Sequence, residues 1–450
     1  MTDLLIQNGT ILSMQTAGEA FGEGAVAIRD GRIAAVGKPA DLKRMGFGEG
    51  KVLNARGQVV MPGLVNAHAH VMGILLKGSS EEQSTRSGLQ KAMRLLFAEA
   101  EPSEKEALAR AAFLEALKSG VTCLGILDGQ VSGLAQAIQE SGIRVVLAEA
   151  LTDVDPTTAA TGAGPIPGAS SGAAAVEALL SIIDSAGPDG GDSGRVTARL
   201  GVFSPATCSD ETLERVAKEA EARRLGLHFH LGAFSGETET LRSRAGGDLF
   251  GLVRRFDLLN SNTLLAGGSH LKEEEVGSLR ESAAQLALTP RADARWGHFS
   301  PVAALLRAKI PLALGTDGVG HDLFSAMRAL LHSACLDAGS GGIIGPREIL
   351  RMATRDGARA LGLLASIGSV EVGKKADLVL VRLDPARASL VESDDPATLV
   401  AEVCGPGDVT DVIVDGEVVV EGGKVKTVDE KAVLKEARKV AAAVWNTVSG

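Results

Sequence analysis

The stretch VVMPGLVNAHAH, residues 59–70, decides how the rest of the chain is interpreted. An apolar run that ends in His68-Ala69-His70 is typical of a buried strand with two polar side chains at its carboxyl end. Because side chains two residues apart along a strand point the same way, both imidazoles face one point. A single His-x-His pair is a weak signal, since a buried histidine is more often a hydrogen-bonded core residue. Its position at a strand end nevertheless indicates a metal site.

Downstream of this stretch, apolar strand-like runs alternate with helical patterns up to about residue 317. Two of the helical patterns, at residues 103–120 and 210–226, end in glycine, which favours a left-handed helix cap. Eight such units predict a (β/α)8 TIM barrel, whose functional side chains lie at the carboxyl ends of its strands. The strands are expected near residues 59–70, 121–128, 144–152, 196–206, 226–234, 262–270, 285–292 and 310–317.

The two ends of the chain share a different pattern, in which short β-like runs are separated by Asn-Gly and Asp-Gly turn signals. LLIQNGTILSM at residues 4–14 and DVTDVIVDGEVVVEGGKV at residues 408–425 are the clearest examples. Both ends are therefore expected to form one small β-sandwich. The predicted domains are this composite sandwich from residues 1–60 and 363–426, the barrel over residues 61–362, and a C-terminal helix over residues 427–450.

The composition excludes several classes of function. The formal net charge is −10, and no basic stripe could bind a phosphate backbone, so nucleic acid is not expected as a partner. No stretch approaches the roughly 18 apolar residues of a membrane span, and the start of the chain lacks a signal-peptide pattern. Four isolated cysteines without CxxC spacing are typical of reduced thiols. A cytoplasmic protein that acts on a small molecule is the expectation.

Further polar side chains stand at the ends of other predicted strands. LGLHFHLG, residues 225–232, places His228 and His230 at the end of the fifth strand with the same spacing of two. LALGTDG, residues 312–318, places Asp317 at the end of the eighth. Since all barrel strands end on one face, these groups are expected to meet His68 and His70 there. Imidazoles with one carboxylate suit zinc and Fe(II) alike, so one divalent metal is predicted, zinc before Fe(II).

Six stretches together carry a resemblance to a known family. They are MPGLVNAHAH (61–70), LEALKSGVT (114–122), LHFHLG (227–232), LALGTDG (312–318), ATRDGARALGL (353–363) and IGSVEVGKKADLVLV (367–381). The combination resembles the amidohydrolase superfamily, and within it the branch of cytosine, guanine and adenosyl-type deaminases and triazine hydrolases. The resemblance extends from about residue 4 to residue 425.

The resemblance implies a role for each matching residue. His68 and His70 would be metal ligands from the first strand, His230 a ligand from the fifth, and Asp317 both ligand and general base from the eighth. His228 resembles a neighbour of the ligand. The resemblance also implies a homodimer. No lysine stands on the fourth strand to be carboxylated, so a bridged two-metal site is not expected.

Two positions depart from the family pattern, and both concern proton transfer. Members usually have a Glu three residues after the strand-five ligand, which shuttles a proton to the leaving group, and Ala233 stands there. They usually have a His at the end of strand six, which polarises the attacked bond, and Gly267 stands there. The leaving group therefore needs another proton donor. The first candidates are His270 and His321, and the others are Glu237 and His298.

The expected function is hydrolysis of a C–N bond by water that the metal activates. Asp317 would accept the proton of this water, and His270 or His321 would supply the proton for the leaving group. Deamination of a heterocycle and opening of an amide or cyclic amide both fit. The alternative, which the two departures favour, is a catalytically silent barrel that binds a metal or ligand or belongs to a larger assembly. A lyase or a dehalogenating hydrolase also stays open.

Overall fold

The eight strands expected for a barrel form one parallel sheet in the computed structural model of the chain, which describes residues 4–15, 20–77, 100–154, 176–177, 180–181, 194–388 and 395–449. The strands follow one another in sequence order across the sheet, as a (β/α)8 barrel requires. They are β6 (Leu64–Ala69), β7 (Val121–Asp128), β8 (Arg144–Glu149), β9 (Val196–Gly201), β10 (Leu227–Leu231), β11 (Thr263–Gly267), β12 (Gln285–Leu288) and β13 (Leu312–Leu314).

The barrel closes between its last and first strands, directly at the expected metal site. Ala69 and Asp317 form a parallel bridge just beyond the end of β13. The Thr316 and Asp317 N–H groups donate to the His68 carbonyl, at 3.0 and 3.1 Å. The His70 N–H in turn donates to the Asp317 carbonyl at 3.2 Å. The backbone hydrogen bonds that close the barrel therefore also fix the distance between Asp317 and the two histidines at the end of β6.

Helices surround the sheet, and their starts follow ordinary capping rules. Pro102 opens α3, where Glu101 and Glu104 form a capping box, and Ser209 accepts the Thr212 N–H at the start of α7. The larger helices of the barrel region are α3 (Pro102–Lys118), α4 (Ala135–Ser141), α7 (Asp210–Arg223), α8 (Ser235–Arg244), α9 (Gly251–Arg255), α10 (Val276–Ser282), α11 (Pro290–Arg295), α12 (Val302–Arg307), α13 (Leu323–Ala338), α14 (Pro346–Met352) and α15 (Arg355–Ala360). Within the described ranges, every helix is too short or too polar to span a lipid bilayer.

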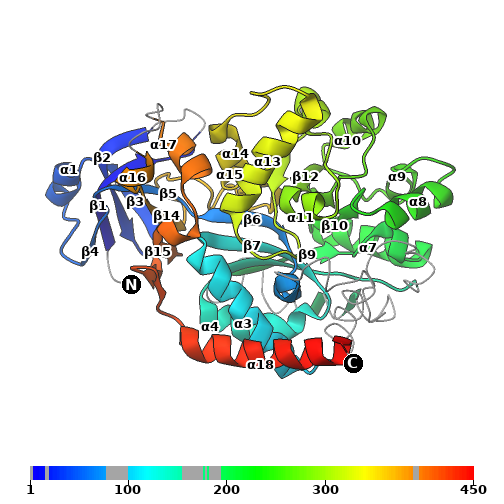
Figure 1. Cartoon of the computed structure of the whole chain (residues 1–450), viewed down its shortest axis with the longest axis horizontal. Coiled ribbons are helices and arrows are strands. Elements are labelled where there is room, and N and C mark those ends of the chain that lie inside the picture. Colours follow the sequence, from blue (N-terminus) through cyan, green and yellow to red (C-terminus); the bar gives the residue numbers. More distant parts are fainter. Residues whose placement is uncertain are drawn as a thin grey trace.

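The strands from both chain ends form a second sheet beside the barrel (Figure 1). Its nine strands are hydrogen-bonded to one another and enclose an apolar core of their own, with Ile6, Ile28, Leu378 and Ile413 among its members. They are β1 (Leu4–Leu12), β2 (Ala20–Arg29), β3 (Arg32–Gly37), β4 (Lys51–Asn54), β5 (Gln58–Pro62), β14 (Leu378–Arg382), β15 (Val409–Val414), β16 (Glu417–Glu421) and β17 (Lys424–Val425). The expected fold class, a TIM barrel with a small β-sandwich from both chain ends, is confirmed, and the strands of the two ends form one hydrogen-bonded sheet of nine strands.

The run at residues 59–70, expected as one barrel strand, is two strands that belong to different sheets. β5 pairs with β14 in the end sheet, and β6 pairs with β7 in the barrel. The chain changes sheets at Gly63, where an added Cβ would lie 2.1 Å from the Thr122 hydroxyl oxygen. A glycine is thus required where the chain passes close to β7. The sequence did not reveal that β5 and β6 are separate strands, because residues 59–67 are apolar almost without interruption.

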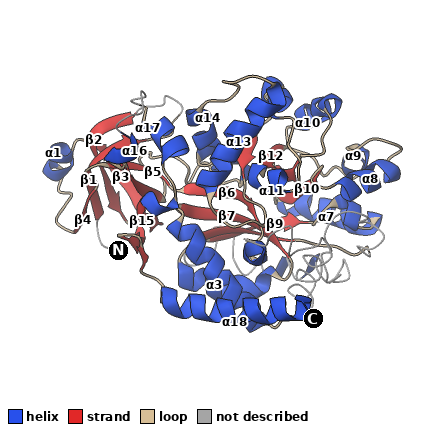
Figure 2. Ribbon diagram, viewed as in Figure 1, coloured by secondary structure: helices blue, strands red, loops and turns tan. Residues whose placement is uncertain are grey.

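A buried ion pair connects the two sheets. Arg144, at the start of β8, donates two hydrogen bonds to Asp377, at 2.7 and 2.9 Å, and both side chains are almost fully buried. The C-terminal helix α18 (Glu430–Ser449) lies along α3 (Figure 2). Lys118 of α3 pairs with Glu430 at 2.9 Å. Most of the Gly-rich segment between residues 154 and 195 lies outside the described residues.

Candidate metal centre

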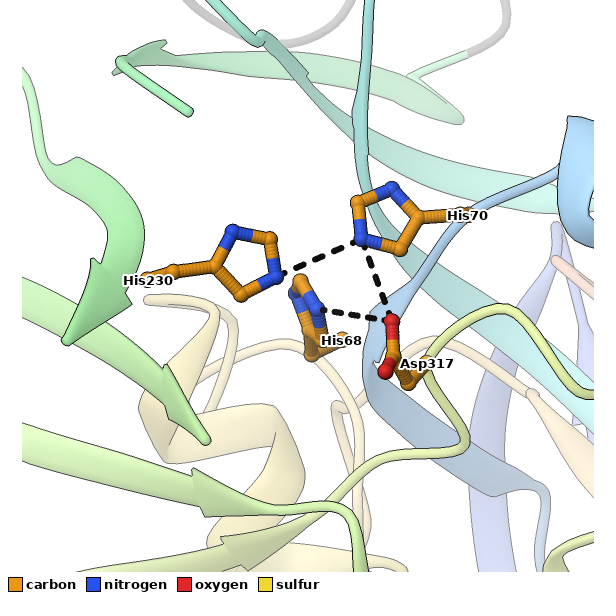
Figure 3. A group of neighbouring side chains, drawn as sticks. All are labelled: His68, His70, His230 and Asp317. Carbon is orange, nitrogen blue, oxygen red and sulfur yellow. Dashed lines mark hydrogen bonds and ion pairs between the residues drawn. The ribbon is translucent and has the colours of Figure 1, made fainter. Parts of the chain in front are cut away.

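Four side chains from three strand ends converge at the mouth of the barrel (Figure 3). One ligand atom from each of His68, His70, His230 and Asp317 can be chosen so that all four lie within 4.8 Å of one another. The His70 Nε2 atom lies 3.4 Å from the His230 Nε2 atom and 3.2 Å from the Asp317 Oδ1 atom. The His68 Nε2 atom lies 3.8 Å from the same Oδ1 atom. The structure thus brings together all four residues predicted as ligands.

The backbone at Asp317 has the left-handed conformation that non-glycine residues seldom adopt, with φ of 55°. The two backbone bonds with His68 and His70 hold it there. This conformation turns the carboxylate toward the imidazoles, at the edge where β13 meets β6 (Figure 3). An aspartate in an uncommon conformation that neighbouring contacts impose is typical of a functional position.

Hydrogen bonds and contacts at the outer nitrogens orient the imidazoles so that their inner Nε2 atoms face a common centre. His230 Nδ1 donates to the Phe203 carbonyl at 2.9 Å, and His70 Nδ1 lies 3.3 Å from Asp128 Oδ1. In a neutral imidazole that donates through Nδ1, Nε2 carries a lone pair. His68 Nδ1 contacts His228 Nε2 at 3.0 Å, and the buried His68 Nε2 has no hydrogen-bond partner in the described structure. Facing lone pairs and an orphaned nitrogen fit a cation at their centre.

The charge balance of the cluster supports the same conclusion. Burial acts to raise the pKa of Asp317, but its interactions with the His68 and His70 imidazoles hold that pKa well below its ordinary value. Burial and the neighbouring imidazoles hold the pKa of His230 well below its ordinary value. For His70, hydrogen bonds to Asp128 and Asp317 outweigh burial and raise the pKa to about 10. Without metal, a proton on His70 compensates the carboxylates, and a bound cation would displace it.

Asp128, at the carboxyl end of β7, orients His70 and was not singled out from the sequence. Its Oδ2 atom accepts the Val71 N–H at 2.6 Å, and its Oδ1 atom faces His70 Nδ1. The sequence did offer a signal for this role, because Asp128 is an acidic residue at the carboxyl end of a barrel strand. His228, by contrast, was expected to be a neighbour of the ligands, and it contacts His68 from behind.

Asp128→Asn should weaken metal binding by about 10–100-fold, the usual effect of losing the partner of a ligating histidine. If the oxygen of the new amide keeps the Val71 N–H, the NH2 group of that amide faces His70 Nδ1 and donates to it. The His70 proton then moves to Nε2, which can no longer bind a metal. Competition with a chelator would measure this, and an unchanged dissociation constant would contradict the orienting role.

The two departures from the family pattern touch each other in space. An added Cβ on Gly267 would lie 2.5 Å from the Ala233 Cβ atom and 2.8 Å from its Cα atom. Gly267 also has φ of 104°, a conformation that favours glycine. The loop after β10 therefore occupies the space that a side chain at position 267 would need. The two departures from the family pattern are therefore direct neighbours, and a side chain at position 267 would require this loop to move.

Gly267→Ala should lower the free energy of unfolding by about 1–3 kcal/mol, because the new methyl group clashes with Ala233 and the backbone is strained. Gly277→Ala is the matched control. Gly277 lies in α10 with no atom near its absent Cβ, so alanine there should be neutral or stabilise by up to about 1 kcal/mol. Denaturant unfolding measures both, and equal effects would show that the loop does not fill this space.

Glu237 does not face the cluster. Its carboxylate accepts the Ala233 and Phe234 N–H groups, at 2.8 and 3.2 Å, and the Ser204 hydroxyl at 3.0 Å. Burial raises the pKa of Glu237, while these hydrogen bonds act in the opposite direction. Glu237 therefore fixes the loop that contains Ala233, and its bonds leave no oxygen directed at a substrate.

The candidate proton donors occupy two different environments. His270 is half-buried with its ring centroid 4.3 Å from that of His298, and neither belongs to the group of four ligands. Burial and then the charge of His298 lower the pKa of His270. His321 is fully buried, and neither ring nitrogen has a hydrogen-bond partner among the described residues. Burial lowers the pKa of His321 to about 4, so its ring is neutral near pH 7.

The fold is an eight-stranded parallel barrel, and three imidazoles and one carboxylate meet at the carboxyl ends of its strands. The chain is thus a (β/α)8 barrel protein with a candidate metal centre at the usual place for an active site. The sequence profile of the Amidohydrolase family matches residues 59–419, and a short profile of the bacterial imidazolonepropionase-like composite domain matches residues 24–45. The chain therefore belongs to the amidohydrolase family.

The chain is similar over nearly its whole length to three proteins. It is 32% identical to a 5-methylthioadenosine/S-adenosylhomocysteine deaminase of Moorella thermoacetica, over 98% of this chain and 99% of the relative. An adenosine deaminase from Xanthomonas campestris with bound zinc has a TM-score of 0.88 and 26% identity, over 98% of both chains. An atrazine chlorohydrolase from Arthrobacter aurescens complexed with zinc has a TM-score of 0.83 and 21% identity, over 97% of this chain and all of that one. The similarity to the atrazine chlorohydrolase shows that the two chains share a fold.

Proposed function

We propose that this protein is a zinc-dependent hydrolase that removes an amino group from a heterocycle. One observation carries the proposal: three imidazole nitrogens and one carboxylate oxygen converge within 4.8 Å at the mouth of the barrel. Zinc suits such a set of ligands. The zinc-bound adenosine deaminase, similar over nearly the whole chain, supports this choice of metal. The deaminase of Moorella thermoacetica supports an amino-substituted purine as substrate class.

In this proposal His68, His70 and His230 hold the ion through their Nε2 atoms, and Asp317 contributes an oxygen. A bound zinc ion lowers the pKa of a coordinated water to near neutrality. Asp317 is the general base that accepts a proton from the attacking water, because its low pKa keeps it ionised. Asp128, His228 and the Phe203 carbonyl hold the imidazoles in the orientation that binding needs.

The leaving nitrogen needs a proton as well. His270 and His321, the candidates from the sequence, both follow barrel strands on the catalytic side, and both stay candidates for contact with the substrate. The orphaned ring of His321 could bind a polar group of the substrate, since both its nitrogens are without a partner among the described residues. His270 is partly exposed, and its ring lies beside that of His298.

We also propose a homodimer in a reducing, cytoplasmic setting. All four cysteines are free thiols, and three of them are buried, which suits a reducing compartment. Burial raises the pKa of Cys123 to about 12, so this thiol does not ionise near neutral pH. Light scattering on the purified chain would measure the mass of the assembly, and a monomer mass would contradict the dimer.

Ammonia release from a panel of heterocycles tests the proposed function. The panel contains adenosine, 5-methylthioadenosine, S-adenosylhomocysteine, cytosine, guanine and an aminotriazine. Hydantoin represents the cyclic amides and is followed by substrate loss, because opening of its ring releases no ammonia. We expect ammonia from at least one amino compound, loss of that activity after chelation, and recovery with zinc. The alternative of a silent barrel predicts that a panel member raises the thermal unfolding midpoint of the zinc-loaded protein with no turnover.

A further inference from the structure

Two phenylalanine rings lie against His230, one of the four clustered residues. The Phe203 ring centroid lies 4.7 Å from the His230 ring centroid, and the Phe234 ring centroid lies 5.4 Å from it. The two phenylalanine rings also stack on each other, with centroids 6.0 Å apart and planes 18° apart. All three separations are in the range of attractive contacts between aromatic rings. The metal centre therefore has an aromatic surface as its direct neighbour on the side of β10.

The two rings belong to a small apolar cluster inside the mouth of the barrel. Its buried members are Leu127, Ala148, Ala150 and Phe203, and Phe234 packs against them. Gly201 of β9 pairs in register with His228, so an added Cβ at Gly201 would point into the barrel as the His228 ring does. That Cβ would lie 3.1 Å from the Leu127 Cδ1 atom and 3.0 Å from the Ala148 Cβ atom. The apolar cluster thus lines the inner side of the strand ends next to His230.

The polar side chains of the loop after β9 are hydrogen-bonded within their own surroundings. The Ser204 hydroxyl donates to the Glu237 carboxylate at 3.0 Å and accepts the Ala206 N–H at 3.2 Å. The Thr207 hydroxyl donates to the Ser204 carbonyl at 2.9 Å. These polar groups therefore stabilise the loop. The side-chain contact of this loop with the metal centre is made by the ring of Phe203.

Phe234 is the more exposed of the two rings. Phe203 is 6% exposed, whereas Phe234 is partly exposed at the start of α8. Phe234 directly follows Ala233, which stands where family members have a glutamate and which lies against Gly267. A heterocycle that brings its reacting carbon to the metal centre would therefore meet a flat apolar ring on this side.

We propose that Phe234 determines substrate specificity by stacking on the flat face of the reacting heterocycle, an inference that rests on the proposed function. The ligand class is a neutral, fully unsaturated ring such as an amino-substituted purine or pyrimidine. Stacking of a base on an aromatic side chain changes affinity by about 5–100-fold on substitution with alanine. The contact is the same before and during the reaction, so its loss weakens binding and leaves the chemical step unchanged.

Three substitutions of Phe234 in the zinc-loaded protein test the stacking contact. The substrate is the panel compound with the highest kcat/KM. Phe234→Ala should raise KM by about 5–100-fold and change kcat by less than about twofold. Phe234→Leu keeps an apolar side chain without a flat ring and should resemble Phe234→Ala. Phe234→Tyr keeps the ring and should recover most of the affinity that Phe234→Leu loses. A fall in kcat at constant KM, or a wild-type KM in Phe234→Leu, would overturn the proposal.

Two controls separate stacking on the substrate from support of the metal ligand. Phe256→Ala removes another partly buried ring, which follows α9 and lies under the Arg255 guanidinium, and it should leave KM unchanged. Zinc affinity of Phe234→Ala, measured by competition with a chelator, should equal that of the wild type, because the Phe203 carbonyl still holds His230. A loss of zinc affinity as large as the rise in KM would overturn the proposal.

Calorimetry with adenosine keeps the stacking contact testable if the wild type turns over no panel compound. Absence of turnover would reject the proposed function, and the dissociation constant of adenosine from the zinc-loaded protein would then replace KM. Phe234→Ala should raise this dissociation constant by about 5–100-fold. An unchanged dissociation constant, or no binding of adenosine by the wild type, would overturn the stacking proposal as well.

Discussion

Replacing Asp317 with asparagine should lower kcat/KM for ammonia release by about 10²–10⁴-fold, the contribution expected of a general base. Asparagine has the same shape but cannot accept a proton from water. It also tolerates the left-handed conformation that Asp317 adopts at φ of 55°, so the loop can keep its backbone. The loss should appear in kcat, since the three imidazole ligands, His68, His70 and His230, are still in place and the asparagine keeps an oxygen at position 317. Steady-state kinetics on the zinc-loaded variant measures it.

Asp30→Asn controls for the substitution itself. Asp30 has a left-handed backbone with φ of 50° as well, but it lies in an exposed turn of the end sheet. The variant should have wild-type kinetics. If Asp317→Asn kept more than about a tenth of the wild-type activity, Asp317 would not be the base, and another group would have to accept the proton.

His230→Ala should abolish stoichiometric zinc binding and, with it, activity. The alanine removes an Nε2 ligand that the Phe203 carbonyl keeps unprotonated, at 2.9 Å from Nδ1. A metal that binds only the folded state stabilises it by about 3–4 kcal/mol at 100–1,000 times its dissociation constant. Added zinc should therefore raise the thermal unfolding midpoint of the wild type much more than that of the variant. Metal analysis by mass spectrometry gives the stoichiometry directly.

His332→Ala is the matched control for this experiment, because His332 is exposed on α13 and belongs to no described metal-ligand group. It should bind zinc as the wild type does. Full metal content together with activity in His230→Ala would show that the cluster does not hold the catalytic metal.

The sequence predicted the fold and the four clustered residues because both depend on local periodicity. An alternation of two aims His68 and His70 at one side, and strand ends of a barrel meet on one face. That geometry brings Asp317 and the pair His228 and His230 to the same face, and the resemblance to the amidohydrolase superfamily selected His230 as the ligand. The division of the first strand at Gly63 could not be predicted, because it depends on the contact with Thr122 of β7.

Residues whose role depends on contacts through space were missed or misplaced. Asp128 is the last residue of β7, and only the fold shows that its carboxylate faces His70 and accepts the Val71 N–H. The loss of side chains at Ala233 and Gly267 was visible in the sequence, but their contact was not. Glu237 was considered as a proton donor because it is near His230 in sequence, yet backbone N–H groups occupy its carboxylate.

Anomalous diffraction at the zinc edge, on crystals of the zinc-loaded protein, tests the metal site most directly. One peak is predicted in the barrel mouth, about 2.0–2.2 Å from the Nε2 atoms of His68, His70 and His230 and from an oxygen of Asp317. The site would be contradicted by a peak with other ligands, or by no peak within reach of these four side chains.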